Sequence, residues 1–216
     1  MPFYLLNDDL WFPPVSEAME DGLLAAGGDL RTERLLLAYR SGIFPWFNEE
    51  DPPLWWSPNP RCVLFPARLK ISKSMQQVMR RKSFEFRTDT DFASVIRNCR
   101  HAPRAGQDGT WITDDIIAAY TKLHQLGCAH SAEAWQDGQL VGGLYGIRLG
   151  KVFFGESMFS HVSNASKFAF IQYVQQLQAG GVELIDCQVH TTHLESLGAA
   201  MIPREEFMRL LGKLIP

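Results

Sequence analysis

The stretch "GVELIDCQVH" at residues 181–190 has the length and composition of a buried β-strand, yet it carries Asp186 and Gln188 near its centre. Successive side chains of a strand point to opposite faces, so these two polar residues share a face with Leu184, while Ile185 points the other way. Burying a lone carboxylate costs several kcal/mol unless the group is paired or protonated. The strand therefore indicates either a buried partner for Asp186 or a function that uses it.

The segments before this strand predict the order helix, three strands, helix, strand. Thr113 is a suitable N-cap, and the turn residues Asp137, Gly138 and Gly150 separate three strands. From Asn164 onward, apolar residues recur at helical spacing. The expected elements are a helix at 113–126, strands at 130–136, 139–149 and 151–157, a helix at 164–179 and the strand at 182–189. Because the last strand follows a helical crossover, we expect a mixed sheet and an α/β (α+β) fold.

The first half of the chain follows a different pattern, with helices expected at 32–41, 72–82 and 90–100. The segment "GIFPWFNEEDPPLWWSPNPR" (42–61) is rich in proline, which excludes helices and central strands, so we expect an ordered loop held by its aromatic rings. "HAPRAGQDG" (101–109) is a plausible boundary. The expected domains are an N-terminal segment (1–61), a basic helical part of the same N-terminal domain (62–105) and a C-terminal domain (106–216).

The composition excludes several classes of protein. Of the 216 residues 46% are hydrophobic and 21% charged, which is ordinary for a globular protein with a real core. No apolar run approaches the roughly 20 residues of a membrane helix, and the N-terminus lacks the pattern of a signal peptide. Four widely spaced cysteines without a C-x-x-C pair favour a reduced, cytoplasmic protein without structural zinc. His190 and His193 have no nearby carboxylate pattern, so we expect no metal site there.

Charge is distributed unevenly along the chain. Between Arg61 and Arg104 there are eleven basic and three acidic residues, although the net charge of the whole chain is −3. Such segregation predicts a surface that faces a polyanion such as nucleic acid. The alternative is a helical face that is merely solvated.

The predicted order of elements is also that of the acyltransferase fold typified by the GCN5-related N-acetyltransferases. In that fold the two strands that flank the crossover helix splay apart, and acyl transfer occurs in the gap. By this fold-level analogy, Glu156 would lie at one cleft with Asp186 and Gln188. The analogy suggests a reaction class only.

Eight short motifs make the resemblance more specific. In order they are "GGDL" (27–30), "GIFPWF" (42–47), "WWSPNPR" (55–61), "GTWIT" (109–113), "LVGGLYG" (140–146), "FGESMFS" (154–160), "NASK" (164–167) and "LIDCQ" (184–188). Together they resemble the bacterial leucyl/phenylalanyl-tRNA–protein transferase family over residues 20–210. The resemblance implies a cytoplasmic enzyme that moves Leu or Phe, and Met less well, from aminoacyl-tRNA to the α-amine of proteins beginning with Arg or Lys. The product enters N-degron proteolysis.

The resemblance also implies a small N-terminal domain and an acetyltransferase-like C-terminal domain, with no metal, nucleotide or coenzyme A. Trp46 and Trp111 match family positions associated with the terminal adenosine of the tRNA, although both could instead be core rings. Trp55 and Trp56 lie among prolines and are interpreted as structural. The candidates for contacts with tRNA phosphates are Lys73, Arg80, Arg81 and Lys82.

The aminoacyl side chain requires an apolar pocket. The expected lining residues are Leu144, Phe153, Met158, Phe170, Tyr173 and Ile185. Most of these would be core residues in any fold of this class. An apolar pocket separates side chains that differ by one methylene by only about 1–3 kcal/mol, so the preference among Leu, Phe and Met stays open.

The acceptor requires carboxylates, because it brings an ammonium and a cationic side chain. Glu156 and Asp186 match the acidic positions of the family. We expect Glu156 to bind the basic acceptor and Asp186 to orient Gln188, whose carbonyl takes a proton from the attacking amine. Two alternatives stay open: Asp186 supports the region of Tyr145 or Arg61 through a buried hydrogen bond, or the ribose hydroxyl of the tRNA shuttles the proton.

Two other functions compete with this reading. A coenzyme A-dependent N-acetyltransferase needs a glycine-rich loop that holds pyrophosphate at a helix N-terminus, and "GESMFSHVSNASK" (155–167) lacks those glycines. A non-catalytic RNA-binding module explains the basic segment but gives no role to Glu156, Asp186 or Gln188. Both are therefore less favoured than aminoacyl transfer.

Overall fold

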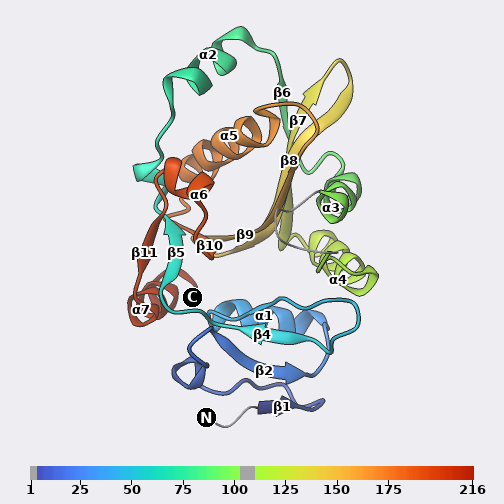
Figure 1. Ribbon diagram of the computed structural model, residues 1–216, viewed down its shortest axis with the longest axis vertical. Helices are drawn as coiled ribbons and strands as arrows, with labels where there is room; N and C mark the ends of the chain where they lie inside the picture. Colours follow the sequence, from blue (N-terminus) through green and yellow to red (C-terminus); the bar gives the residue numbers. More distant parts are fainter. Residues whose placement is uncertain (1–3, 103–109) are drawn as a thin grey trace.

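The computed structural model describes residues 4–102 and 110–216, which form two β-sheets with helices around them (Figure 1). The smaller sheet has the strand order β1-β2-β4-β3. Its elements are β1 (Tyr4–Leu6), β2 (Leu23–Gly27), β3 (Phe44–Pro45) and β4 (Leu54–Trp56), with a 3-10 turn at Val15–Glu17 and helix α1 at Thr32–Arg40. Most of the expected boundary at 101–109 lies outside the described residues.

The proline-rich segment 42–61 is not the loop expected from its composition. It contains β3 and β4, which pair antiparallel with Phe44 opposite Trp56 and Pro45 opposite Trp55. Proline is tolerated here because β3 is the edge strand of its sheet. One edge of its backbone has no partner strand, so no N–H donor is needed there. Trp55 is fully buried and its Nε1 donates to the carbonyl of Gly27, which agrees with a structural role.

The larger sheet has the order β11-β5-β10-β9-β8-β7-β6. Its strands are β5 (Arg61–Leu64), β6 (Glu85–Thr88), β7 (Ala129–Gln136), β8 (Gln139–Leu149), β9 (Val152–Ser160), β10 (Leu184–Gln188) and β11 (Ala200–Ile202). Strands β9 and β10 are parallel, and the other neighbours are antiparallel. The mixed sheet and its crossover helix are therefore as predicted.

Helices cover both faces of this sheet. The remaining helices are the 3-10 turn Pro66–Arg68, α2 (Lys73–Arg81), α3 (Phe92–His101), α4 (Asp114–Gln125), α5 (Ala165–Ala179), α6 (Thr192–Ser196) and α7 (Arg204–Leu214). In Figure 1 the crossover helix α5 lies on one face, and α3 and α4 lie on the other. The predicted order α4-β7-β8-β9-α5-β10 is confirmed. The caps agree too, since the Thr113 hydroxyl accepts a hydrogen bond from the amide of Ile116.

The sequence predicts that residues 62–105 belong to the N-terminal domain, but two strands of this segment belong to the larger sheet. Strands β5 and β6 pair with β10 and β7 of the larger sheet. The two sheets thus meet between Trp56 and Arg61. The spacing of residues along the sequence does not indicate that β5 joins the larger sheet, because its partner β10 lies more than 120 residues further along the chain.

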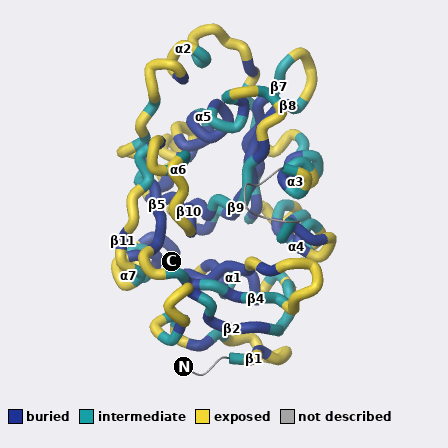
Figure 2. Tube along the Cα trace, in the orientation of Figure 1, coloured by how far each residue is buried: buried dark blue, intermediate teal, exposed yellow. Residues whose placement is uncertain are grey.

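Two hydrophobic cores lie on opposite faces of the larger sheet. One is continuous with the smaller sheet and includes Leu24 of β2, Tyr39 of α1 and Phe154 of β9. The other lies beneath α5 and includes Phe153 and Ile171. Figure 2 shows the central strands of the larger sheet as mainly buried, while α2 is mainly exposed. The first core fixes the two sheets against each other, and the junction between them shapes the site.

Candidate active site at the junction of the two sheets

The site begins where β9 and β10 stop running side by side. Their paired register runs from Leu184 opposite Val152 to Asp186 opposite Phe154. Immediately beyond the pairing, Glu156 of β9 and Gln188 of β10 both line a cavity of about 650 Å³. The splayed strands expected by analogy are thus present, and they bring Glu156 and Gln188 to one cleft.

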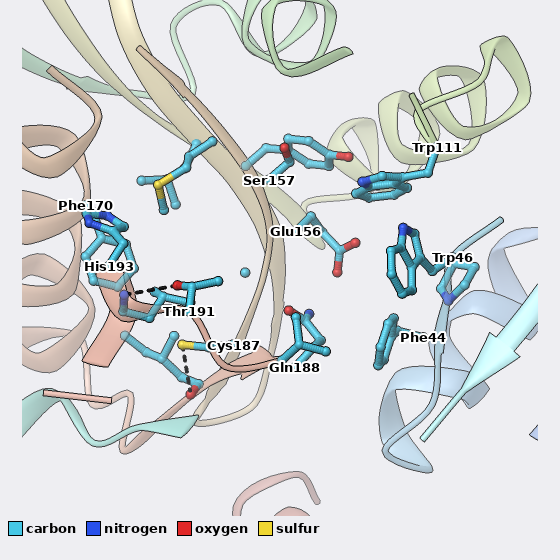
Figure 3. A pocket seen from close by; sticks show the side chains of 18 residues that line it. Phe44, Trp46, Trp111, Glu156, Ser157, Phe170, Cys187, Gln188, Thr191 and His193 are labelled. Atoms are coloured by element: carbon cyan, nitrogen blue, oxygen red, sulfur yellow. Dashed lines mark hydrogen bonds between the residues drawn. The ribbon is translucent and has the colours of Figure 1, made fainter. Parts of the chain in front are cut away.

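Three kinds of side chain line the cleft (Figure 3). On one side lie the aromatic rings of Phe44, Trp46 and Trp111. On the far side lie Phe170 and His193, among apolar residues. Between these two sides, the polar groups of Glu156 and Gln188 point into the open space. The apolar lining includes Leu144, Met158, Phe170, Ile185 and Leu194.

Trp46 is held in place by its neighbour Trp56. The indole Nε1 of Trp56 donates to the Trp46 carbonyl at 2.6 Å, and the two ring centroids are 5.6 Å apart. Trp46 itself is 36% exposed, so part of its ring remains free. Such an exposed, supported ring can stack on a nucleobase, an interaction worth about 1–3 kcal/mol.

Glu156 lies at the end of a buried hydrogen-bond network. The hydroxyl of Tyr39 donates to its Oε1 at 2.7 Å, and that of Tyr120 donates to its Oε2 at 3.2 Å. The two hydroxyls also contact each other. Burial raises the pKa of Glu156 to about 7; the two tyrosine hydrogen bonds oppose this shift, and the nearby Asp186 charge adds to it. Its carboxyl group therefore changes charge near neutral pH.

Asp186 is fully buried behind the cleft and does not line it. Its carboxylate forms a two-pronged ion pair with Arg61: Nε to Oδ1 is 2.8 Å and Nη2 to Oδ2 is 2.7 Å. The guanidinium lies between the rings of Phe44 and Phe207, with centroid distances of 4.8 and 4.6 Å. Arg61 is thus the buried partner that the strand required, and it also supports the aromatic wall through Phe44.

Gln188 adopts a conformation that turns it into the cleft. Its φ is +56°, in the left-handed region, and the register of β10 against β5 shifts between Asp186 and Gln188. The backbone amide of Gln188 donates to Asp186 Oδ1 at 3.0 Å. Asp186 therefore holds the main chain of Gln188, whereas the expectation concerned its side chain.

Two residues expected in the aminoacyl pocket do not line the cleft. Phe153 and Tyr173 are buried in the core beneath α5, where their rings pack edge to face with centroids 5.1 Å apart. Phe153 follows Val152 in the paired part of β9, before the strands separate, so the sheet and α5 cover it. The other four expected residues, Leu144, Met158, Phe170 and Ile185, do line the cleft.

The four expected phosphate contacts lie away from the cleft, on and just after α2. Lys73, Arg80, Arg81 and Lys82 are all exposed. Within residues 4–102 and 110–216, none of them forms an ion pair. In Figure 1, α2 lies at the opposite end of the molecule from the smaller sheet. These cations are free to contact an extended polyanion, and they take no part in the cleft itself.

Sequence reasoning missed several residues of the site. Tyr39 and Tyr120 read as ordinary core positions of amphipathic helices, and only the folded chain brings them to Glu156. Phe44 was quoted only as part of a motif, although its ring forms part of the wall.

His193 also lines the cleft, and in the described part of the chain its buried Nε2 has no hydrogen-bond partner. Burial lowers the pKa of His193, so its imidazole is neutral near pH 7.

Among the described residues, no group of three or more His, Cys, Asp or Glu side chains is arranged to hold a metal ion. No helix in the same part of the chain is long and apolar enough to cross a membrane. The cleft offers stacking surfaces, an apolar end and a titratable carboxyl group beside an amide. This set can bind a nucleobase, an apolar side chain and an amine in mutual contact.

Several solved structures resemble this chain at low sequence identity. They include L-PGS from Bacillus licheniformis, with 12% identity, a TM-score of 0.44, and coverage of 78% of this chain and 53% of that chain. A GCN5-related N-acetyltransferase-like protein from Streptococcus suis has 12% identity, a TM-score of 0.39, and coverage of 74% and 59%. At this level they bear on neither substrate nor mechanism.

Sequence relatives are much closer. The family model described as leucyl/phenylalanyl-tRNA protein transferase matches residues 63–212, and the model of the N-terminal domain of that family matches residues 28–59. A leucyl/phenylalanyl-tRNA–protein transferase of Nitrosospira multiformis is 58% identical, covering 97% of this chain and 91% of the relative. One from Flavobacterium johnsoniae is 59% identical, covering 96% and 98%. The chain therefore belongs to the leucyl/phenylalanyl-tRNA–protein transferase family and is an aminoacyltransferase.

Proposed function

We propose that the cleft moves Leu or Phe, and Met less well, from aminoacyl-tRNA to the α-amine of proteins that begin with Arg or Lys. The transfer takes place in the cytoplasm, and the new N-terminus marks the acceptor for N-degron proteolysis. The observation that carries this proposal is the composition of one cavity: aromatic rings, an apolar end, and Glu156 with Gln188 between them. Each of the three surfaces suits one part of the two substrates.

The terminal adenosine of the tRNA is assigned to the aromatic side of the cleft. Trp46 and Trp111 present ring surface there without any metal or charged group. Stacking tolerates every base, so recognition of the universal tRNA end needs no base-specific hydrogen bonds. Further along the acceptor arm, phosphates are assigned to the four exposed cations on and just after α2, namely Lys73, Arg80, Arg81 and Lys82.

The aminoacyl side chain is assigned to the apolar end, near Met158 and Phe170. Methionine is flexible and polarisable, so Met158 can adapt to side chains of different shape. Since methylene-scale differences are worth only about 1–3 kcal/mol in such a pocket, Leu, Phe and Met are all accepted. The tRNA and the apolar side chain together orient the ester bond toward Glu156 and Gln188.

The acceptor is assigned to the polar centre of the cleft. Glu156, once ionised, attracts the cationic N-terminal residue, and the hydroxyls of Tyr39 and Tyr120 fix the direction of its carboxylate. Gln188 presents an amide whose carbonyl oxygen can accept a hydrogen bond from the attacking amine. Asp186 acts through the backbone of Gln188 and through Arg61, so it is a positioning residue.

The chemistry requires little more than placement. An aminoacyl ester is already activated, and an α-amine with a pKa of about 7.7–8 is partly neutral near pH 7.5. Holding amine and ester in attack geometry can supply roughly 7–11 kcal/mol of the barrier. The amine nitrogen forms the new amide bond as the bond from the carbonyl carbon to the ribose oxygen breaks, and the amine proton, relayed by Gln188 or by the neighbouring ribose hydroxyl, ends on the ribose oxygen that leaves. No metal or coenzyme is required for any of these steps.

The test is a transfer assay with labelled Leu-tRNA and a peptide that begins with Arg. We expect label on the peptide, and none when labelled acetyl-CoA replaces the tRNA. Trp46→Ala should lower the rate at limiting tRNA by about tenfold, in line with the loss of one stacked base, whereas Trp11→Ala, at an exposed ring far from the cleft, should not. Transfer from acetyl-CoA alone, or binding of tRNA without transfer, would overturn the proposal in favour of the acetyltransferase or the RNA-binding module.

A further inference from the structure

Two cysteines lie close together on the neighbouring strands β5 and β10, of which β10 lines the cleft. Strand β10 runs antiparallel to β5, with Asp186 opposite Val63 and Gln188 opposite Cys62. Cys187 is therefore the extra residue of a β-bulge, and it shares Cys62 as its partner with Gln188. The side chains of Cys62 and Cys187 interact directly, so their sulfur atoms are near enough for the pair to be a disulfide candidate.

The two thiols also point to the same side of the sheet. Both belong to the core beneath α5, and both are free cysteines. The contact between the two thiols lowers the pKa of Cys62, as does the nearby Arg61 charge, while burial opposes the shift. The same contact, together with burial, raises the pKa of Cys187. The two sulfur atoms are therefore adjacent, and Cys62 is the more acidic of the two thiols.

Cys187 is accessible from the cleft, whereas Cys62 is not. Cys187 is one of the lining residues, and Figure 3 shows it beside Gln188 in the cleft wall. Cys62 is 1% exposed. A small oxidant that enters the cleft therefore meets Cys187 first, with Cys62 behind it as a resolving thiol.

We propose that Cys62 and Cys187 form a reversible oxidation site. Peroxide converts the two thiols to a disulfide, and aminoacyl transfer is slower while the disulfide is present. The disulfide itself follows from the two strands, whereas its effect on transfer rests on the proposed function of the cleft. The substrate class is hydrogen peroxide or another small peroxide, and thiol reductants reverse the change.

The reaction balances with one peroxide. Cys62, the more acidic thiol, reacts as its thiolate: it takes the proton of Cys187 while the Cys187 sulfur attacks one peroxide oxygen and the O–O bond breaks. The hydroxide that leaves takes the Cys62 proton and becomes water. The Cys62 thiolate then attacks the Cys187 sulfenic acid; an S–S bond forms, an S–O bond breaks, and the second hydroxide becomes water with a solvent proton. Two sulfur atoms are oxidised and two oxygen atoms are reduced.

The disulfide changes the cleft because Cys187 lies between Asp186 and Gln188. An S–S bond of about 2.05 Å draws the Cys187 side chain away from the cleft wall and toward β5. The disulfide then ties the β-bulge to β5, and this bulge is where Gln188 has its φ of +56°. Displacements of about 1 Å near a reacting centre can cost up to a hundredfold in rate, so we expect transfer to fall roughly tenfold or more.

The test treats one sample with hydrogen peroxide and a parallel sample with diamide, which takes two electrons and two protons from a thiol pair without adding oxygen. Treated protein should lose the mass of two hydrogen atoms, yield a linked peptide containing Cys62 and Cys187, and transfer Leu roughly tenfold more slowly. Dithiothreitol should restore the rate. Cys62→Ala should keep its rate under diamide, and Cys128→Ser, which removes a half-exposed thiol elsewhere, should respond like the unmodified protein.

Peptide mapping decides the proposal even if a variant does not fold, because it is done on the natural sequence. Treated protein in which Cys62 and Cys187 both remain free would overturn the disulfide. A linked pair with an unchanged transfer rate would overturn the regulatory effect. Protein that transfers nothing before treatment would contradict the proposed function instead, and the mapping would still stand.

Discussion

At the scale of single residues, the ion pair between Arg61 and Asp186 explains how a carboxylate can lie inside a central strand. The side chains of Arg61 and Asp186 are 1% and 0% exposed, and their two hydrogen bonds are 2.8 and 2.7 Å long. Removing one partner of a buried ion pair leaves the other charge without compensation. We therefore expect Asp186 to contribute to stability as well as to the position of Gln188.

Asp186→Asn should lower the free energy of unfolding by about 3–5 kcal/mol, because it leaves the Arg61 charge buried and unpaired. The measurement is urea denaturation at pH 7.5, with Glu183→Gln as the control, since Glu183 pairs with Lys151 at the surface. The control should change stability by less than about 1 kcal/mol. An Asp186→Asn protein as stable as the control would mean that the ion pair contributes nothing to folding.

Under the proposed function, Glu156 is the residue whose charge links pH to the binding of the acceptor. Its pKa is raised to about 7, mainly by burial. Below that pH the carboxyl group is neutral and attracts a cationic acceptor weakly. Above it the carboxylate is ionised, so affinity for the acceptor rises with pH. The sign for stability is opposite: a folded-state pKa above the unfolded value means that stability is lost as pH rises from about 4.5 to about 7.

At low acceptor concentration the transfer rate should rise with two inflections, one near pH 7 from Glu156 and one near pH 8 from the acceptor amine. Glu156→Gln should lose the lower inflection and keep the upper one. In thermal unfolding at pH 8, the same variant should melt at a higher temperature than the natural sequence, and this gain should shrink toward pH 5. If both proteins give the same pH–rate profile, Glu156 does not set the lower inflection.

At the scale of elements, local signals predicted the second half of the chain well. Turn residues such as Asp137 and Gly138, with φ of +50° and +75°, fixed the β7–β8 hairpin. The strands β5, β6 and β11 were missed because they are short and find their partners far away in sequence. The prolines of segment 42–61 predict a loop, because the sequence alone does not show that β3 is an edge strand, where proline is tolerated.

The site was predictable only in part, for the same reason. Glu156 and Gln188 followed from the splayed strands of the expected fold and from motif resemblance. Tyr39 is 117 residues from Glu156, and Arg61 is 125 residues from Asp186, so no local pattern could pair them. Phe153 and Tyr173 were misplaced because an apolar strand or helix residue does not reveal which core it enters.

Strand β8 needs glycine where it meets β9. A Cβ at Gly146 would lie 2.1 Å from the Phe154 carbonyl and 2.5 Å from the Phe153 ring. Gly146→Ala should therefore destabilise the fold by about 3 kcal/mol or more, which is at or beyond the usual cost of overpacking, since backbone cannot yield. Gly212→Ala in α7 meets no atom within 4 Å and should stabilise by about 0.5–1 kcal/mol. Denaturant titration of both variants checks the pair, and equal stabilities would contradict the packing at β8.

Helix α2 carries the cations that we assign to the tRNA backbone. Replacing Arg80 and Arg81 by Ala should raise the KM for aminoacyl-tRNA and reduce the slope of log KM against log salt by roughly 0.7–0.9 per lost phosphate contact. The turnover number at saturating tRNA should stay the same, because α2 lies away from the cleft. Arg209→Ala on the exposed face of α7 is the control. An unchanged salt slope in the double variant would remove α2 from the tRNA interface.

At the scale of the whole molecule, the site exists because two sheets share one core. The smaller sheet supplies Phe44 and Trp46, and the larger sheet supplies Glu156 and Gln188. Tyr39 of α1 crosses the junction to hold Glu156 in place. Neither sheet has the complete site, so the packing of one sheet against the other is what brings the aromatic wall to the polar centre.

The most direct test of this account compares two acceptor peptides, one beginning with Arg and one with its neutral analogue citrulline. The initial rate of Phe transfer from Phe-tRNA is measured for the natural sequence and for Glu156→Gln. Because a hydrogen bond between charged groups contributes about 1.5–3 kcal/mol, we expect the natural sequence to favour the Arg peptide at least tenfold. In Glu156→Gln that ratio should fall toward one. A ratio that stays the same in the variant would contradict the claim that the acceptor binds at Glu156 in this cleft.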